Sequence, residues 1–179
     1  MPYIVKDNKK EYTPAPEGLH QAVCIDVVDL GIQKTQYGDQ VKIELRWVIE
    51  EIDPKTNKPY MVLRRFTPSL HKKSNLRPTL ESWRGRKFSE EELKGFDIEK
   101  LIGANCQLQI CHNISSEGDT YANVQAVVPI PRNAAKLAVP SDYVRVAERE
   151  KRDEFERNPD GTNHGANGRA IKEDEYIPF

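Results

Sequence analysis

The stretch from Met61 to Phe88 combines cationic and aromatic side chains in a pattern that suits a polyanionic ligand. It holds eight Lys or Arg residues and one Glu, which gives a net charge of +7 over 28 residues. Its aromatic residues are Phe66, Trp83 and Phe88. Cations bind a phosphate chain, and aromatic rings stack on exposed bases with about 1–3 kcal/mol per base. The pattern therefore favours contact with nucleic acid over an ordinary solvated surface.

The net charge of the whole chain, −1, conceals an uneven distribution. From Glu148 to Phe179 there are nine acidic and six basic residues, a net charge of −3, so the rest carries about +2. Phosphate binding depends on the local charge of the binding surface, and the overall charge does not exclude it.

The composition indicates a polar globular protein with one modest core. Of its 179 residues 37% are hydrophobic, and the mean hydropathy is −0.71. The chain lacks a membrane-length apolar run and a signal-peptide pattern, so a cytoplasmic location is expected. Three cysteines, an odd number, predict reduced thiols. Cys111 and His112 are adjacent but have no second ligand pair nearby, so neither a metal nor another cofactor is expected.

Alternation of apolar and polar residues predicts strands at 18–30, 40–50, 60–67, 106–114 and 120–128. A helix is predicted from Leu76, where Leu80 and Trp83 continue an apolar stripe and Gly85 ends it. A capping box at Ser89 opens a second short helix, and Asp97 can cap a further turn. Five strands with a helix between the third and fourth is the order of an OB-fold, a mainly β, partly open Greek-key barrel. An antiparallel sheet with a covering helix has the same order.

The sequence predicts five regions along the chain. These are an N-terminal arm (1–16), the OB-fold domain (17–130), a charged and partly helical extension (131–157), a flexible Gly- and Asn-rich linker (158–172) and a terminal tip (173–179). Within the extension, a solvated helix is predicted over 145–157.

Candidate ligands of phosphate and base are the cations and aromatics of the predicted sheet, its loops and the helix. The cations are Lys34, Lys42, Arg46, Arg64, Arg65, Lys72, Lys73, Arg84, Arg86 and Lys87. The rings are Tyr37, Tyr60, Phe66, Trp83 and Tyr121.

Strand parity assigns faces to several of these candidates. Tyr60, Arg64 and Phe66 share one face, which the charge of Arg64 favours as the outer, binding face. If that face is the inner one, Phe66 belongs to the core. Trp47 is predicted in the core, and the alternative for Trp83 is an anchor of the helix.

The chain ends in Glu173-Asp174-Glu175-Tyr176-Ile177-Pro178-Phe179, three acids followed by a short apolar tip. This tip resembles the C-terminal tip of bacterial-type single-stranded DNA-binding proteins, an acidic run followed by Ile-Pro-Phe. At ordinary residue frequencies, a terminal Ile-Pro-Phe arises by chance about once in ten thousand sequences. Lys172 and Tyr176 depart from the family pattern, so the partner of this tip need not be the usual one.

The stretch 76–103, with Trp83-Arg84-Gly85-Arg86 and Leu101-Ile102-Gly103, also resembles OB-type proteins encoded beside phage replication genes. The two resemblances imply a divergent, phage-type single-stranded DNA-binding protein of the bacterial host cytoplasm, acting in DNA replication, recombination and repair. They also imply partners: nuclease, helicase, primase or polymerase subunits that bind the tip. A homo-oligomer is possible.

Two other classes of function are considered. One is an adaptor that mimics the tip, occupies its partner proteins and binds no DNA. The other is an enzyme such as a small nuclease, but the carboxylates Glu44, Asp53 and Asp97 are scattered and no phosphate-cradling Gly loop or nucleophile arrangement is present. The sequence therefore favours a binding protein without enzymatic activity.

Overall fold

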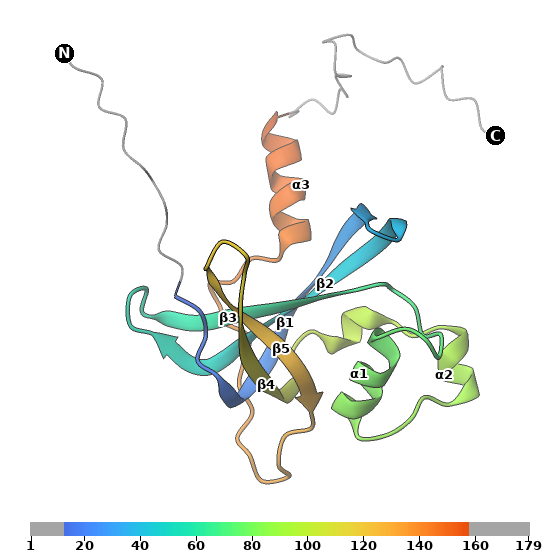
Figure 1. Ribbon diagram of the computed structural model, residues 1–179, viewed down its shortest axis with the longest axis horizontal. Coiled ribbons are helices and arrows are strands. Elements are labelled where there is room, and N and C mark those ends of the chain that lie inside the picture. The colour runs from blue at the N-terminus through green and yellow to red at the C-terminus, as the bar shows by residue number, and fades with distance from the viewer. Residues whose placement is uncertain (1–12, 158–179) are drawn as a thin grey trace. The chain divides into compact units, whose positions relative to one another are not determined.

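The computed structural model describes residues 13–157, and their main element is one five-stranded antiparallel sheet (Figure 1). The strands are β1 (Gly18–Thr35), β2 (Gly38–Asp53), β3 (Lys58–Phe66), β4 (Asn105–Ile114) and β5 (Thr120–Val128). Their order in the sheet is β3-β2-β1-β4-β5, and no ladder closes β3 onto β5. Helices α1 (Leu76–Arg84) and α2 (Glu90–Lys94) and the 3-10 helix η1 (Ile98–Leu101) connect β3 to β4. The predicted mainly β architecture is confirmed.

A bulge in β1 changes which of its residues face the core. Cys24 is paired with Trp47 and Asp26 with Arg46, so Ile25 is an extra residue in this strand. An extra residue reverses the alternation beyond it. Val27 therefore packs in the core cluster with Ala22 and Cys24, whereas the regular alternation expected of this strand would place Val27 on the opposite face.

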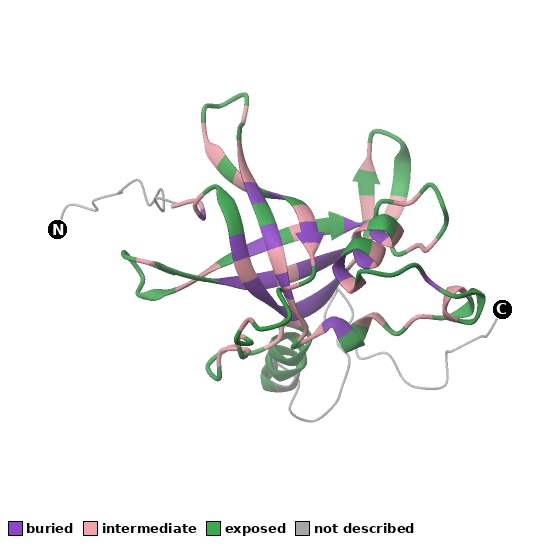
Figure 2. Ribbon diagram, turned by 90° about the horizontal axis from the view of Figure 1, so that it is seen from below, coloured by how far each residue is buried: buried purple, intermediate pink, exposed green. Residues whose placement is uncertain are grey.

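The core lies between the inner face of the sheet and the apolar stripe of α1 (Figure 2). Leu76, Leu80 and Trp83 are the buried residues of α1, as their spacing predicts. Trp83 Nε1 donates to the carbonyl oxygen of Asn105 at 2.9 Å, and its ring centroid lies 5.9 Å from that of Trp47. Trp47 is fully buried, which confirms its predicted place in the core.

The last residues of the predicted N-terminal arm, 13–16, pack against the sheet. Ala15 is 1% exposed and belongs to the core cluster. Two histidines hold its backbone: His112 Nε2 lies 2.7 Å from the Ala15 oxygen, and His20 Nε2 lies 2.9 Å from the Pro16 oxygen. The sequence could not indicate this because one of the two partners is almost a hundred residues away.

A second unit begins at Asp142 and contains helix α3 (Val146–Arg157), at the position where a helix was predicted. Within this unit, the guanidinium of Arg149 lies 5.6 Å from the ring centroid of Tyr143. None of the helices in residues 13–157 is long and apolar enough to cross a membrane.

Candidate nucleic-acid interface

One end of the sheet brings together several of the predicted phosphate ligands. Ile43 of β2 is paired with Phe66, the last residue of β3, and the β1–β2 hairpin continues beyond this point to Thr35 and Gly38. The loop 67–75 begins at the same place, where Lys42 Nζ donates to Thr67 Oγ1 at 2.8 Å. We call this region the cationic end of the sheet, and its residues are Lys34, Tyr37, Lys42, Arg65, Lys72 and Lys73. One acid, Asp39, lies across the hairpin from Lys34.

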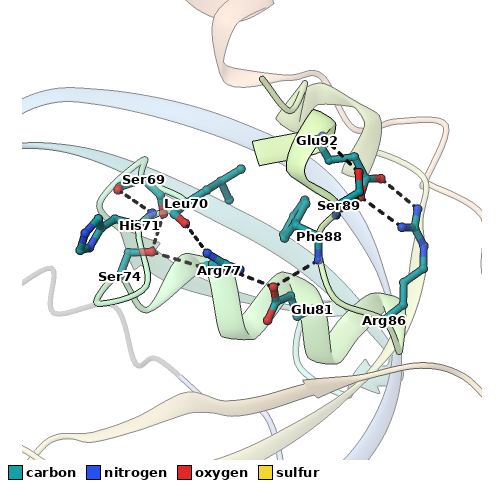
Figure 3. Close-up of polar contacts among 10 residues, drawn as sticks. All are labelled: Ser69, Leu70, His71, Ser74, Arg77, Glu81, Arg86, Phe88, Ser89 and Glu92. Atoms are coloured by element: carbon teal, nitrogen blue, oxygen red, sulfur yellow. Dashed lines mark hydrogen bonds and ion pairs between the residues drawn. The ribbon is translucent and has the colours of Figure 1, made fainter. Parts of the chain in front are cut away.

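The loop 67–75 is held by its own hydrogen bonds (Figure 3). Ser74 Oγ donates to the Ser69 oxygen at 2.5 Å, and the His71 amide donates to Ser69 Oγ at 3.1 Å. The Lys73 amide donates to His71 Nδ1 at 3.2 Å. These bonds fix the backbone while the side chains of Lys72 and Lys73 remain exposed, without an ion pair to any residue that the structure describes. Their charges are therefore available to a ligand.

Arg77 and Glu81 tie this loop to α1 and to the connection that follows α1 (Figure 3). Arg77 Nη1 donates to the Leu70 oxygen at 3.4 Å and its Nε to Glu81 Oε1 at 3.0 Å. The same carboxylate oxygen accepts from the Phe88 amide at 3.2 Å. The hydrogen bond from Arg77, and then that from Phe88, lowers the pKa of Glu81. Arg77 thus has a structural role, and it forms part of a shallow groove with Leu70, Lys72 and Leu93.

Glu92 neutralises two of the predicted phosphate ligands. Its carboxylate accepts from Arg84 Nη2 at 2.5 Å and from Arg86 Nη2 at 3.0 Å. The Arg84 guanidinium also lies 4.5 Å from the ring centroid of Phe88. The hydrogen bond from Arg86, followed by those from the Ser89 amide and Arg84, lowers the pKa of Glu92 from 4.5 to about 2. The charge of the 61–88 stretch is thus partly balanced by an acid that lies just beyond it in sequence.

A buried carboxylate on the outer face of β2 engages two further candidates. Glu44 is 2% exposed and accepts from Arg46 Nε at 2.7 Å and from Arg65 Nε at 3.0 Å. A buried carboxylate requires such partners, because its desolvation is otherwise uncompensated. Arg46 is mostly buried, whereas the side chain of Arg65 is 62% exposed. Arg65 can therefore reach a ligand while it remains bonded to Glu44.

The face predicted for Tyr60, Arg64 and Phe66 is wrong, because these residues point toward the core. Phe66 is 2% exposed, and Tyr60 is partly buried against the core cluster. The Arg64 guanidinium lies 5.0 Å from the Phe66 centroid, and Nη1 donates to the Gln125 oxygen of β5 at 3.4 Å. Burial lowers the pKa of Arg64. Arg64 thus bridges the two edge strands of the sheet.

Of the three remaining aromatic candidates, Trp83, Tyr121 and Tyr37, one lies at the cationic end. Trp83 is 6% exposed, so it anchors α1, which was the alternative considered for it. Tyr121 is half exposed but lies opposite Asn113 in the β4–β5 hairpin, near the start of β1, whereas Tyr37 lies beyond its end. Tyr37 is 81% exposed and is the one candidate ring at the cationic end. Lys87 is exposed in the connection between α1 and α2.

Sequence reasoning did not identify the residues that support this end of the sheet. Ser69, His71 and Ser74 shape the loop, and Glu44 orients Arg65. For Glu92 a signal was available, because the Ser89 capping box includes it, and both reciprocal bonds of that box are present. Its pairing with Arg84 and Arg86 depends on the fold of the connection and could not be inferred from the box.

Replacing Glu92 with Gln should reduce the dependence of stability on pH. A carboxyl group whose pKa is depressed in the folded state stabilises it above the ordinary pKa, 4.5, and loses that contribution as pH falls toward about 2. Gln can still serve in a capping box, so E92Q isolates the charge. Thermal unfolding at about pH 6 and about pH 2.5 should give midpoint temperatures for wild type and E92Q whose difference becomes smaller in acid. The same difference in midpoint temperature at both pH values would contradict the role given to this carboxylate.

Three of the predicted regions lie wholly or partly outside the described residues. These are residues 1–12 of the N-terminal arm, the linker 158–172 and the tip 173–179. Among residues 13–157, no three His, Cys, Asp or Glu side chains are grouped so that they could hold a metal ion. The chain matches no protein-family model, and no curated protein matches its sequence.

Proposed function

We propose that this protein binds single-stranded DNA without sequence preference and recruits genome-maintenance proteins through its C-terminal tip. One observation carries the DNA-binding part. Lys72 and Lys73 are exposed and have no ion pair within residues 13–157, on a loop whose backbone is fixed by Ser69, His71 and Ser74. A pre-shaped cationic loop binds phosphate with a small ordering cost. Tyr37, on the neighbouring hairpin, offers an exposed ring for stacking.

We also propose that the sheet is an OB-type open barrel. Three features support this: five antiparallel strands, a helix between the third and fourth, and edge strands β3 and β5 close enough for Arg64 to bond to Gln125. In OB-folds the face of strands 2 and 3 and the loops at its rim bind oligonucleotides. Arg65 on β3 and the β1–β2 hairpin correspond to those places.

The tip resembles that of single-stranded DNA-binding proteins, and its chemistry suits capture by a protein pocket. Phe179 supplies a terminal ring and carboxylate, and Pro178 lowers the ordering cost on binding. The acids Glu173, Asp174 and Glu175 would steer the tip toward a basic surface. DNA binding and partner binding would thus reside in separate parts of the chain.

The double substitution K72Q/K73Q tests the DNA-binding proposal. It should weaken binding of a fluorescent single-stranded oligonucleotide about tenfold at low salt and lower the slope of log K against log salt by about 1.4, the value for two lost phosphate contacts. The matched control is K94Q/K100Q, which removes two exposed lysines from α2 and η1. Equal affinity and slope for both variants would show that the loop does not contact DNA.

The adaptor alternative is favoured by a different observation. Arg46, Arg65, Arg77, Arg84 and Arg86 all have carboxylate partners within the fold, which reduces the charge available to DNA. An adaptor would use the tip alone and occupy partner proteins without DNA. Charge reversal at the exposed Lys72 and Lys73 (K72E/K73E) distinguishes the two functions, because only a DNA-binding protein loses oligonucleotide affinity.

A further inference from the structure

The outer face of the sheet carries charged side chains on one half and none on the other. On β2 and β3 this face carries Lys42, Glu44, Arg46 and Arg65. On β4, β5 and residues 18–23 of β1, the outward positions contain no Asp, Glu, Lys or Arg, although 31% of the chain is charged. Gln21 donates to the Ala135 oxygen and Val23 is fully buried, so the exposed part of this neutral half consists of Leu19 and the outward side chains of β4 and β5. Such a charge-free surface on a highly charged protein requires an explanation.

Five side-chain amides dominate this neutral half, which we call the amide face: Gln107, Gln109, Asn113, Asn123 and Gln125. Two large apolar side chains accompany them, Leu19 with 57% and Tyr121 with 48% of their surface exposed. Cys111 lies near the centre, paired with Asn123, and its thiol donates to Gln125 Oε1 at 2.7 Å. Depletion of charge together with exposed aromatic and aliphatic groups is typical of the centre of a protein–protein interface.

The side chains of the amide face indicate which class of partner can bind there. Nucleic acid is a poor candidate, because binding without cations leaves the phosphate charge uncompensated. A charged protein surface would bury its charges against amides without gaining an ion pair. An amide carries both a donor and an acceptor, so a surface of amides is complementary to a copy of itself. Two-fold association presents the same patch on both subunits and therefore needs this self-complementarity.

We propose that the amide face is a homotypic interface, on which a second copy of this chain docks about a two-fold axis. The face is provided by an antiparallel sheet, and two such faces can stack with an inter-sheet distance of about 10 Å. Leu19 and Tyr121 supply apolar area, and the amides supply hydrogen bonds between the subunits. The cationic end lies at the other end of β1 and stays accessible in each subunit.

The variant Q109E/N123D tests this interface with changes that preserve side-chain shape. Both positions are exposed, so the fold should be unaffected, which circular dichroism can verify. Sedimentation of the full-length protein from about 1 to about 100 μM should show a wild-type dimer and a variant whose dissociation constant rises at least about 30-fold, because like charges meet across the axis. The control Q36E/N133D adds the same charge at two exposed positions elsewhere and should dimerise as wild type does.

Cys111 offers an independent measurement in the natural sequence. Cys24 and Cys106 are buried, whereas Cys111 is partly exposed on the amide face, so a maleimide should label it first. Labelling should convert the dimer to monomer, and dimerisation at high concentration should slow the labelling. A wild-type monomer at about 100 μM, or a dimer that persists in both Q109E/N123D and the labelled protein, would overturn the proposal.

Discussion

Replacing Trp83 with Ala is expected to lower the free energy of unfolding by about 3–5 kcal/mol, the range for large aromatic residues in a core. Trp83 is 6% exposed, packs on Trp47 and donates to the Asn105 oxygen at 2.9 Å. The substitution removes apolar burial, leaves a cavity beneath α1 and deprives a β4 carbonyl of its donor. Because α1 is continuous with the loop 67–75, the same change should also loosen the cationic end.

Two companion variants separate the role of Trp83 in the core from one in base stacking. W83F keeps a ring in the core and should cost less than W83A, while leaving oligonucleotide affinity nearly unchanged. Y37A removes a ring that is 81% exposed, so it should change stability by less than about 0.5 kcal/mol and weaken binding by about 1–3 kcal/mol. Urea unfolding followed by circular dichroism measures the free energy of unfolding, and fluorescence anisotropy measures the affinity for the oligonucleotide. The opposite result, affinity lost in W83F and kept in Y37A, would make Trp83 the stacking residue.

Deleting Ile177, Pro178 and Phe179 is expected to abolish recruitment of partner proteins and to leave affinity for single-stranded DNA within about twofold. A few buried anchor residues carry most of the energy of such an interface, and Phe179 with its carboxylate is the anchor expected here. The deletion removes no cation, so the phosphate contacts of Lys72 and Lys73 should persist. The two activities should therefore separate in one variant.

Pull-down of host nucleases, helicases and polymerase subunits measures the loss of recruitment, and anisotropy measures the retained DNA affinity. A chain in which residues 176–179 are scrambled keeps the composition and the acids, so it serves as the matched control and should also fail. A synthetic peptide of residues 173–179 should compete with the intact protein for its partners. Recruitment that survives both the deletion and the scramble would show that the partners bind elsewhere.

Much of the sheet could be predicted from sequence because its strands alternate regularly. Ile43, Leu45 and Trp47 face the core as their spacing predicts, and the stripe of α1 is buried along Leu76, Leu80 and Trp83. The ends of the strands could not be predicted where apolar and polar residues do not alternate. The segment from Gln33 to Asp39 is polar on both faces, so the predicted strands leave out residues 31–39, whereas β1 and β2 continue to Thr35 and Gly38.

The faces of the candidate residues were harder to predict, because parity depends on features that leave no local signal. The bulge at Ile25 reverses the alternation of β1. On β3, the charge of Arg64 predicts that this residue lies on the outer face, but its long side chain extends along the inner face to Gln125 at the open edge. Long cations cover apolar rings in this way, so the charge of one residue is weak evidence for the face of a strand.

The available charge also differs from the charge counted in sequence. Counting cations between residues 61 and 88 assumes that their partners lie in the same stretch, but Glu92 and Glu44 lie outside it. Lys72 and Lys73 remain available because their loop satisfies its polar groups internally. Only the fold distinguishes a cation that is engaged from one that can bind phosphate.

A direct comparison of single-stranded and duplex DNA tests the central claim of single-stranded DNA binding. The full-length protein is titrated against a labelled oligonucleotide of mixed sequence, and against the same oligonucleotide annealed to its complement, at about 50 and about 200 mM salt. We predict a dissociation constant of about 1 μM or below for the single strand at the lower salt, at least about tenfold weaker binding to the duplex, and a steep loss of affinity at the higher salt. Equal affinity for the duplex, or no binding of the single strand at the lower salt, would contradict the proposed function.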